Sequence, residues 1–291
     1  MTVALTIAAI AIAALTWWFA TGAVLWLGRA ANEWHKTAML ALAVPAVLAL
    51  LLIVAIRDEL TVITAIAGFS AAVAVWAWHE AAFLFGHLLG PRRAPCPHGA
   101  SHRQRFGFAF AAMRDHEIAL AATLGLLALL TWGAANTVAL QTFAVLWLCR
   151  LAAKLCIFEG VPAMAHNLMP ERLAHLKSYF GEGRPGTAFA FAMAGMGAAL
   201  AVLVMSAMTA ETSGGLVGTV LLATLLSLAI IEHAFMVLPV RDEKLWKWAA
   251  PHADAVEGAG TCAFLGRMPN ARKLQGVALE ARAVVPSRRA T

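Results

Sequence analysis

The sequence predicts an all-α membrane protein with seven spanning helices, its N-terminus outside and its C-terminus in the cytoplasm. Of its 291 residues, 61% are hydrophobic and 13% are charged, whereas soluble domains are roughly 45–50% apolar and about 25% charged. Apolar runs of about 20 residues are typical of transmembrane helices, and seven such runs follow one another along the chain. The composition therefore excludes a soluble globular protein.

The predicted spans form a membrane domain over residues 1–250. They cover about 3–27, 37–56, 60–89, 117–136, 138–158, 187–209 and 215–240. The first run has no basic segment before it and no clear cleavage site, so we interpret it as a retained span and not as a signal peptide.

The basic residues predict the orientation. If the N-terminus lies outside, Arg57 is the only one of the 22 Lys and Arg residues on the outer side. An excess of Lys and Arg in cytoplasmic loops is the general rule for membrane proteins. We therefore expect a multi-pass membrane protein with a cytoplasmic C-terminus. The net charge of +6 follows from this topology and does not indicate nucleic-acid binding.

Two segments are too polar to span. Residues 159–186 contain three prolines, and within them Leu173, Leu176 and Phe180 recur at helical spacing, which favours an interfacial helix in contact with membrane lipids. Residues 251–291 are basic and rich in Ala and Gly with weak periodicity, so we predict a mostly disordered cytoplasmic tail.

Ionisable residues gather at one depth near the cytoplasmic ends of the spans. In the stretch 76–93, which ends in a doubly basic turn, His79, Glu80 and His87 are predicted to lie on one continuous helix, on which Glu80 and His87 are two turns apart and share a face. His79 precedes Glu80, and the pairs His116-Glu117 and Glu232-His233 occupy the fourth and seventh spans. Charged groups at hydrocarbon depth are costly, which favours a functional site. The structural alternative is that they pair with Arg150 and Lys154, since ion pairs that only support the fold also cluster.

Three chemistries fit this polar layer. A transition metal such as iron could be held by carboxylates and imidazoles, and the candidate ligands are Glu80, His87, His116, Glu117, Glu159, His166, Glu232 and His233. A tetrapyrrole could take an axial ligand from His79, His87, His116 or His233. A proton relay is the third possibility, although the outer halves of the spans carry almost no ionisable side chain. The chain has neither a His-Glu-x-x-His motif nor a Glu-x-x-His pair on these spans, which disfavours a zinc peptidase and a ferritin-like di-iron centre.

Several motifs resemble those of the photosynthetic complex assembly proteins of purple bacteria (PuhE-like), which are associated with reaction-centre genes. The resemblance rests on Trp17-Trp18-Phe19, Gly90-Pro-Arg-Arg-x-Pro-Cys-Pro97, His116-Glu117, Ser178-Tyr-Phe180 and Glu232-His233-x-Phe-x-Val-Leu-Pro239. It extends over about residues 16–250. This sequence differs from the family pattern at Cys156, where the pattern leads us to expect Asn. Glu159 and His166 are additions to that pattern.

The resemblance implies a role in assembling the reaction centre and its core antenna in a bacterial inner membrane, cytoplasmic or intracytoplasmic, with reaction-centre or light-harvesting subunits as partners. It also implies that a tetrapyrrole, if one is bound, is of the bacteriochlorophyll type. It implies no catalytic residue. The competing hypothesis, which rests on the Glu/His layer, is a membrane metalloenzyme of the oxidase or hydroxylase type that acts on a lipid or a tetrapyrrole. A structural scaffold is the third hypothesis.

Overall fold

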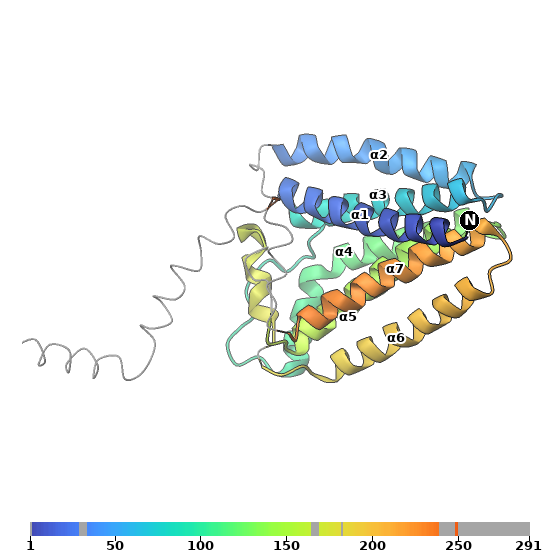
Figure 1. Cartoon of the computed structure of the whole chain (residues 1–291). Helices are drawn as coiled ribbons and strands as arrows, with labels where there is room; N and C mark the ends of the chain where they lie inside the picture. Colours follow the sequence, from blue (N-terminus) through green and yellow to red (C-terminus); the bar gives the residue numbers. More distant parts are fainter. Residues whose placement is uncertain (1, 29–33, 164–168, 182, 239–247, 250–291) are drawn as a thin grey trace, which may run out of the picture. The chain divides into compact units, whose positions relative to one another are not determined.

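The computed structural model describes residues 2–28, 34–163, 169–181, 183–238 and 248–249, and all regular structure in these ranges is helical (Figure 1). The helices are α1 (Thr2–Gly28), α2 (His35–Ala55), α3 (Val62–Leu84), α4 (His102–Leu130), α5 (Val138–Glu159), the 3-10 helix η3 (Glu171–Tyr179), α6 (Thr187–Met208) and α7 (Ser213–Phe235). The predicted tail, 251–291, lies outside the described residues.

Six of the described helices are long and apolar enough to cross a membrane: α1, α2, α3, α5, α6 and α7. The seventh predicted span, 117–136, corresponds to the second half of α4, which ends at Leu130. Arg114, Asp115 and Glu117 make the apolar part of α4 more polar than the other six helices. The prediction of an all-helical membrane protein is confirmed, while the seventh span and the orientation of the termini stay predictions.

Helices α3 and α7 form the centre of the bundle. Helix α3 contacts α1, α2, α5 and α7, and α7 contacts α1, α5 and α6 as well. In the most apolar stretch of α7, half of the residues are buried, whereas only 6% of the residues are buried in the corresponding stretch of α6. Helix α6 therefore presents most of its surface outward, as a helix at the edge of a membrane bundle does.

The prediction of one continuous helix through His87 is wrong, because α3 ends at Leu84. Gly86 has a φ of +80°, which favours glycine. The amide of Gly86 donates to the carbonyl of Phe83, and the amide of His87 donates to that of Ala82. These two bonds form a Schellman motif, which ends the helix and turns the chain away.

Residues 91–114 lie between the third and fourth predicted spans, and their second half is helical. Helix α4 begins after Ser101, whose side chain accepts from the amide of Gln104 while the Gln104 side chain accepts from the amide of Ser101. This capping box satisfies amides that the first helical turn leaves unpaired. The short loop before it packs closely on α4, since the amide of Gly90 donates to the carbonyl of Ala112 at 2.8 Å.

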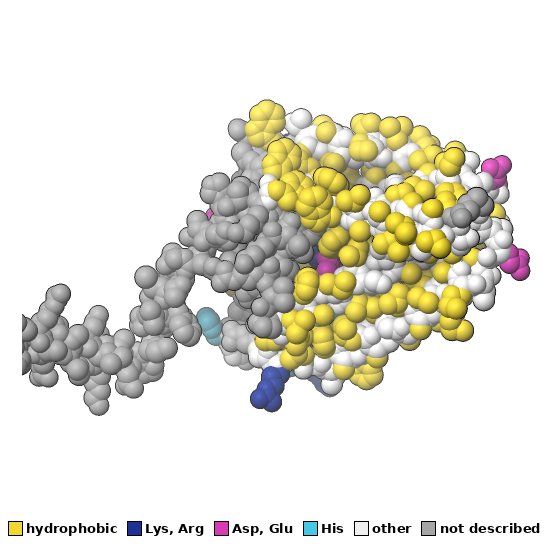
Figure 2. All heavy atoms as spheres, viewed as in Figure 1, with side chains coloured by type: hydrophobic (Ala, Val, Ile, Leu, Met, Phe, Trp, Pro, Cys, Tyr) yellow, Lys and Arg dark blue, Asp and Glu magenta, His cyan; other side chains and the backbone are white. Residues whose placement is uncertain are grey.

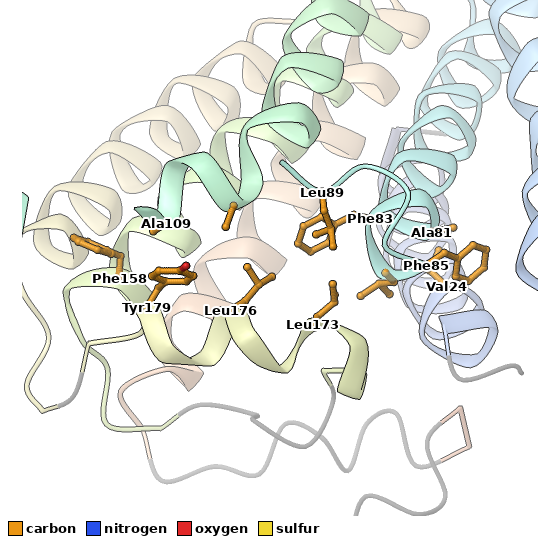
Figure 3. Packing of buried hydrophobic residues seen from close by; sticks show 12 residues of the cluster. Val24, Ala81, Phe83, Phe85, Leu89, Ala109, Phe158, Leu173, Leu176 and Tyr179 are labelled. Atoms are coloured by element: carbon orange, nitrogen blue, oxygen red, sulfur yellow. The ribbon is translucent and has the colours of Figure 1, made fainter. Parts of the chain in front are cut away.

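The predicted helix after Pro170 is present as η3. A 3-10 helix repeats every three residues, so Leu173, Leu176 and Tyr179 share one face, and all three are buried. Figure 3 shows this face packed beneath the ends of the long helices, against Phe83 and Phe158 among others. Because the repeat is three and not 3.6, the third buried residue is Tyr179 and not the predicted Phe180.

Candidate functional site

Glu80 lies at the centre of the polar layer. Its Oε2 accepts a hydrogen bond from Nη2 of Arg150 on α5 at 3.0 Å, and its Oε1 lies 3.6 Å from Nε2 of His116 on α4. The Glu80 side chain is 10% exposed and that of His116 is fully buried. Helices α3, α4 and α5 are therefore joined at this depth by a buried carboxylate with a guanidinium on one oxygen and an imidazole beside the other.

A second ion pair joins α4 to α5. Glu117 accepts hydrogen bonds from Nζ of Lys154 and, at 3.0 Å, from Nε1 of Trp147. Lys154 lies one turn along α5 from Arg150. Each of these two cations has its own carboxylate partner, Glu80 for Arg150 and Glu117 for Lys154. For Glu80 and Glu117, the structure therefore agrees with the alternative that the ionisable residues pair with Arg150 and Lys154 and support the fold.

His233 belongs to α7 and is 2% exposed. Its Nδ1 lies 2.8 Å from the carbonyl oxygen of Ala229. Because a carbonyl can only accept, Nδ1 carries a proton, and in the neutral imidazole Nε2 then carries the lone pair. Nε2 is buried without a hydrogen-bond partner. The neighbouring Glu232, in contrast, is an exposed residue of α7.

A cavity of about 400 Å³ brings several of these groups together. Its polar lining comprises Glu80, Arg150, Lys154, Glu232 and His233, from three helices. Figure 2 shows an acidic and a basic side chain set into an otherwise apolar face of the molecule. The volume lies within the range of small-molecule and cofactor sites, roughly 300–1,000 Å³.

The rest of the cavity wall is apolar. Trp17 of α1, Trp76 of α3 and Leu225 of α7 line it deeper in the bundle, and Leu173 and Tyr179 of η3 line its end. The cavity is thus amphipathic. Its charged groups lie near the end that η3 covers, and its apolar part extends toward the middle of the spans.

Three hydrogen bonds join η3 to the loop between α3 and α4. Nε of Arg92 donates to the phenolic oxygen of Tyr179 at 2.8 Å, and the Tyr179 hydroxyl donates to the carbonyl of Ala94. The amide of Cys96 donates to Oγ of Ser178 at 2.8 Å. The two segments that carry the Gly-Pro-Arg-Arg and Ser-Tyr-Phe motifs therefore bind each other.

The other predicted ligands lie elsewhere. Nε2 of His79 bonds to the hydroxyl of Thr123 on α4 at 2.9 Å, and His87 is exposed beyond the end of α3. The Glu159 carboxylate accepts from the amide of Ala188 at 2.8 Å and so caps the start of α6. His166 lies outside the described residues.

No three His, Cys, Asp or Glu side chains within the described ranges are placed to hold a metal ion together. Of the predicted site residues, the structure unites Glu80, Glu232 and His233 around the cavity, with His116 behind Glu80. Sequence reasoning missed Trp147, Thr123 and Tyr179. Only Tyr179 had a signal, since it lies within the Ser-Tyr-Phe motif.

Comparisons with known proteins agree over most of the chain. The family described as "Protein of unknown function (DUF3623)" matches residues 3–257. A protein of Rhodobacter capsulatus described as "Uncharacterized 30.4 kDa protein in puhA 5'region" is 39% identical over 245 residues, which cover 82% of this chain and 88% of that protein. No solved structure matches the chain.

Proposed function

Because the chain belongs to the DUF3623 family, we propose that it is an integral inner-membrane assembly factor for the bacterial photosynthetic reaction centre and its core antenna. The observation that carries this proposal is the relative from Rhodobacter capsulatus, whose description places it in the 5′ region of puhA. The motifs of the sequence resemble the assembly proteins associated with reaction-centre genes, which agrees with that location.

The described residues support a role in handling a hydrophobic component. Six helices are suited to a membrane, and the cavity is large enough for a small amphipathic molecule. Assembly of a pigment–protein complex requires that subunits and pigments meet within the bilayer. In this proposal the outward faces of the helices contact reaction-centre or light-harvesting subunits, and seven spans place the N-terminus outside and the C-terminus in the cytoplasm.

Deletion of the gene in a phototrophic host tests the proposal. We expect reduced reaction-centre and core-antenna absorbance in membranes from cells grown under phototrophic conditions, and recovery when the wild-type gene is returned. Soluble and respiratory proteins serve as the internal control, because a general membrane defect would lower respiratory proteins as well. Normal levels of both photosynthetic complexes in the deletion strain would overturn the proposal.

A further inference from the structure

We propose that the cavity between α1, α3, α5 and α7 binds one metal-bearing tetrapyrrole with an uncharged rim, and that Nε2 of His233 is the axial ligand of its metal. As a statement of what the protein handles, this inference rests on the proposed assembly role. Its argument uses only the residues that form the cavity and their immediate partners.

Nε2 of His233 is a buried acceptor without a partner. Two described residues of the cavity wall, Glu80 and His233, have a buried side-chain atom that makes no hydrogen bond. Oε1 of Glu80 lies 3.6 Å from the imidazole of His116, whereas no hydrogen bond from a described residue reaches Nε2 of His233. An unpaired buried acceptor costs about 1–3 kcal/mol, so we infer that an occupant of the cavity supplies its partner.

The surroundings of His233 favour a metal over a water molecule as this partner. A buried water takes roughly two to four polar partners. The cavity-lining residues one turn to either side of His233 on α7 are Ala229 and Met236, and both have apolar side chains. A neutral imidazole nitrogen is the commonest metal ligand in proteins, and a metal that lacks a single ligand needs nothing further from the wall.

The scarcity of other ligands favours a macrocycle over a bare ion. Within the described ranges, no three His, Cys, Asp or Glu side chains are grouped to hold a metal. A tetrapyrrole supplies four nitrogens of its own, so one imidazole completes the site, as a proximal His does for haem iron. The volume of about 400 Å³ lies within the range of cofactor sites, roughly 300–1,000 Å³. Trp17, Trp76 and Phe235 of the wall provide the aromatic surface against which flat rings pack.

The charges around the cavity favour an uncharged rim. Arg150 already bonds to Glu80 and interacts electrostatically with Glu232. Lys154 is paired with Glu117. These three carboxylates and two cations leave one negative charge in excess. Carboxylates on the ligand would add to this excess in a region of low dielectric, whereas esterified carboxyl groups would not.

The test titrates the full-length protein in a non-ionic detergent with zinc protoporphyrin IX dimethyl ester. Imidazole is a good ligand for zinc, and a nitrogen bound to the zinc moves the main absorption band of the porphyrin to longer wavelength. The metal-free ester is the matched control, because it has the same rim and no metal. We expect the band shift, and binding at least about tenfold tighter than that of the metal-free ester, since even a change behind a metal ligand costs about 10–100-fold in affinity. Zinc protoporphyrin IX with free carboxylates should bind more weakly than its ester.

Two variants locate the site. His233→Gly should abolish the band shift and the preference for the zinc ester, and imidazole added in solution should restore the shift by occupying the space of the lost side chain. Ala229→Phe keeps His233 but fills the cavity, which Ala229 lines, and should abolish binding of both esters. His87→Gly is the matched control, because His87 is exposed beyond the end of α3, and it should bind as the wild type does.

Equal affinity of the wild type for the zinc and metal-free esters would overturn the proposal, as would a band shift that persists in His233→Gly or unchanged binding by Ala229→Phe. Each variant is first checked for the melting temperature of the wild type. If His233→Gly unfolds, His233→Leu replaces it, since leucine has no lone pair and should lose the shift as well. A deletion strain with normal reaction centres would overturn the assembly role and leave this binding unchanged, whereas a purified protein that binds no porphyrin would leave the deletion result as it stands.

Discussion

Nε of Arg92 lies 2.8 Å from the hydroxyl oxygen of Tyr179, which joins two segments that are 87 residues apart in the chain. The same hydroxyl donates to Ala94, so its oxygen serves as acceptor and donor at once. Through these bonds the loop after α3 holds η3 against the bundle.

Tyr179→Phe should therefore lower the thermal stability of the protein. It removes a hydroxyl with two partners and leaves Nε of Arg92 and the carbonyl of Ala94 without theirs, which costs about 1–3 kcal/mol. The apparent melting temperature in detergent provides the measurement. Ser178→Ala is the control, because Ser178 is exposed and water can replace its contact with Cys96; equal effects of the two changes would contradict the assignment.

Glu80→Gln should lower the melting temperature of the protein more than the double change E80Q/R150Q does. The single change leaves the Arg150 guanidinium without its carboxylate. Because the Arg150 side chain is 47% exposed, we expect a cost below the roughly 3–5 kcal/mol of breaking a fully buried ion pair. The double change leaves two neutral amides that can bond to each other. Melting temperatures of the wild type, Glu80→Gln, Arg150→Gln and the double variant give the coupling between the two side chains. If the losses of the two single variants add up to the loss of the double variant, Glu80 and Arg150 do not form a stabilising pair.

Gly90→Ala should destabilise the protein. A Cβ at this position would overlap the backbone carbonyl of Ala111, and backbone cannot move aside as the end of a side chain can. Gly107→Ala is the matched control on exposed α4 surface, where a Cβ meets nothing within 4 Å. That change should stabilise the helix by about 0.5–1 kcal/mol. Opposite shifts in melting temperature are expected.

His175 of η3 should make stability depend on pH. Burial lowers the pKa of its imidazole, assisted by the charge of Arg93 and opposed by a hydrogen bond with the backbone of Arg172. Since the unfolded state then binds more protons, stability is full above the ordinary value of about 6.5 and is lost as pH falls through that value. His175→Gln should flatten the decline in melting temperature between about pH 7 and 5. An unchanged decline would exclude His175 as its cause.

Reporter fusions distinguish seven spans from six. If α4 crosses the membrane, a reporter fused after Trp132 and one fused after Gly99 should report opposite sides. If α4 lies along the surface, both should report the same side. The control pair is Arg57 and Gly99, which flank α3, a helix apolar enough to span, and should differ in either case.

The class of the protein was predictable because apolar runs of span length are a local property of the sequence. Six of the seven predicted spans agree with their helices to within five residues at each end. The end of α3 was missed because apolar residues continue past Gly86, so hydropathy could not show where the backbone reverses. The start of α4 was missed for the opposite reason, since charged residues before His116 concealed a capped helix.

The sequence allowed us to predict that the ionisable residues lie at a similar depth, but not which of their side chains contact one another. Depth along each helix follows from counting residues, which placed Glu80 and Glu232 near the same end. Rotation of each helix about its axis depends on packing, and this turned His79 toward Thr123 and Glu117 toward Lys154. Opposite charges at the same depth were the available signal for these ion pairs, whereas nothing in the sequence marked a cavity.

The position of η3 across one end of the cavity determines how any occupant arrives. Leu173, Leu176 and Tyr179 of η3 line that end and are buried, so an occupant that entered past η3 would have to displace them, and we expect exchange sideways from the surrounding lipid. Occupancy then follows the mole fraction of the guest in the bilayer, and a change in the lipid composition of the cell alters it even when the amount in solution is constant.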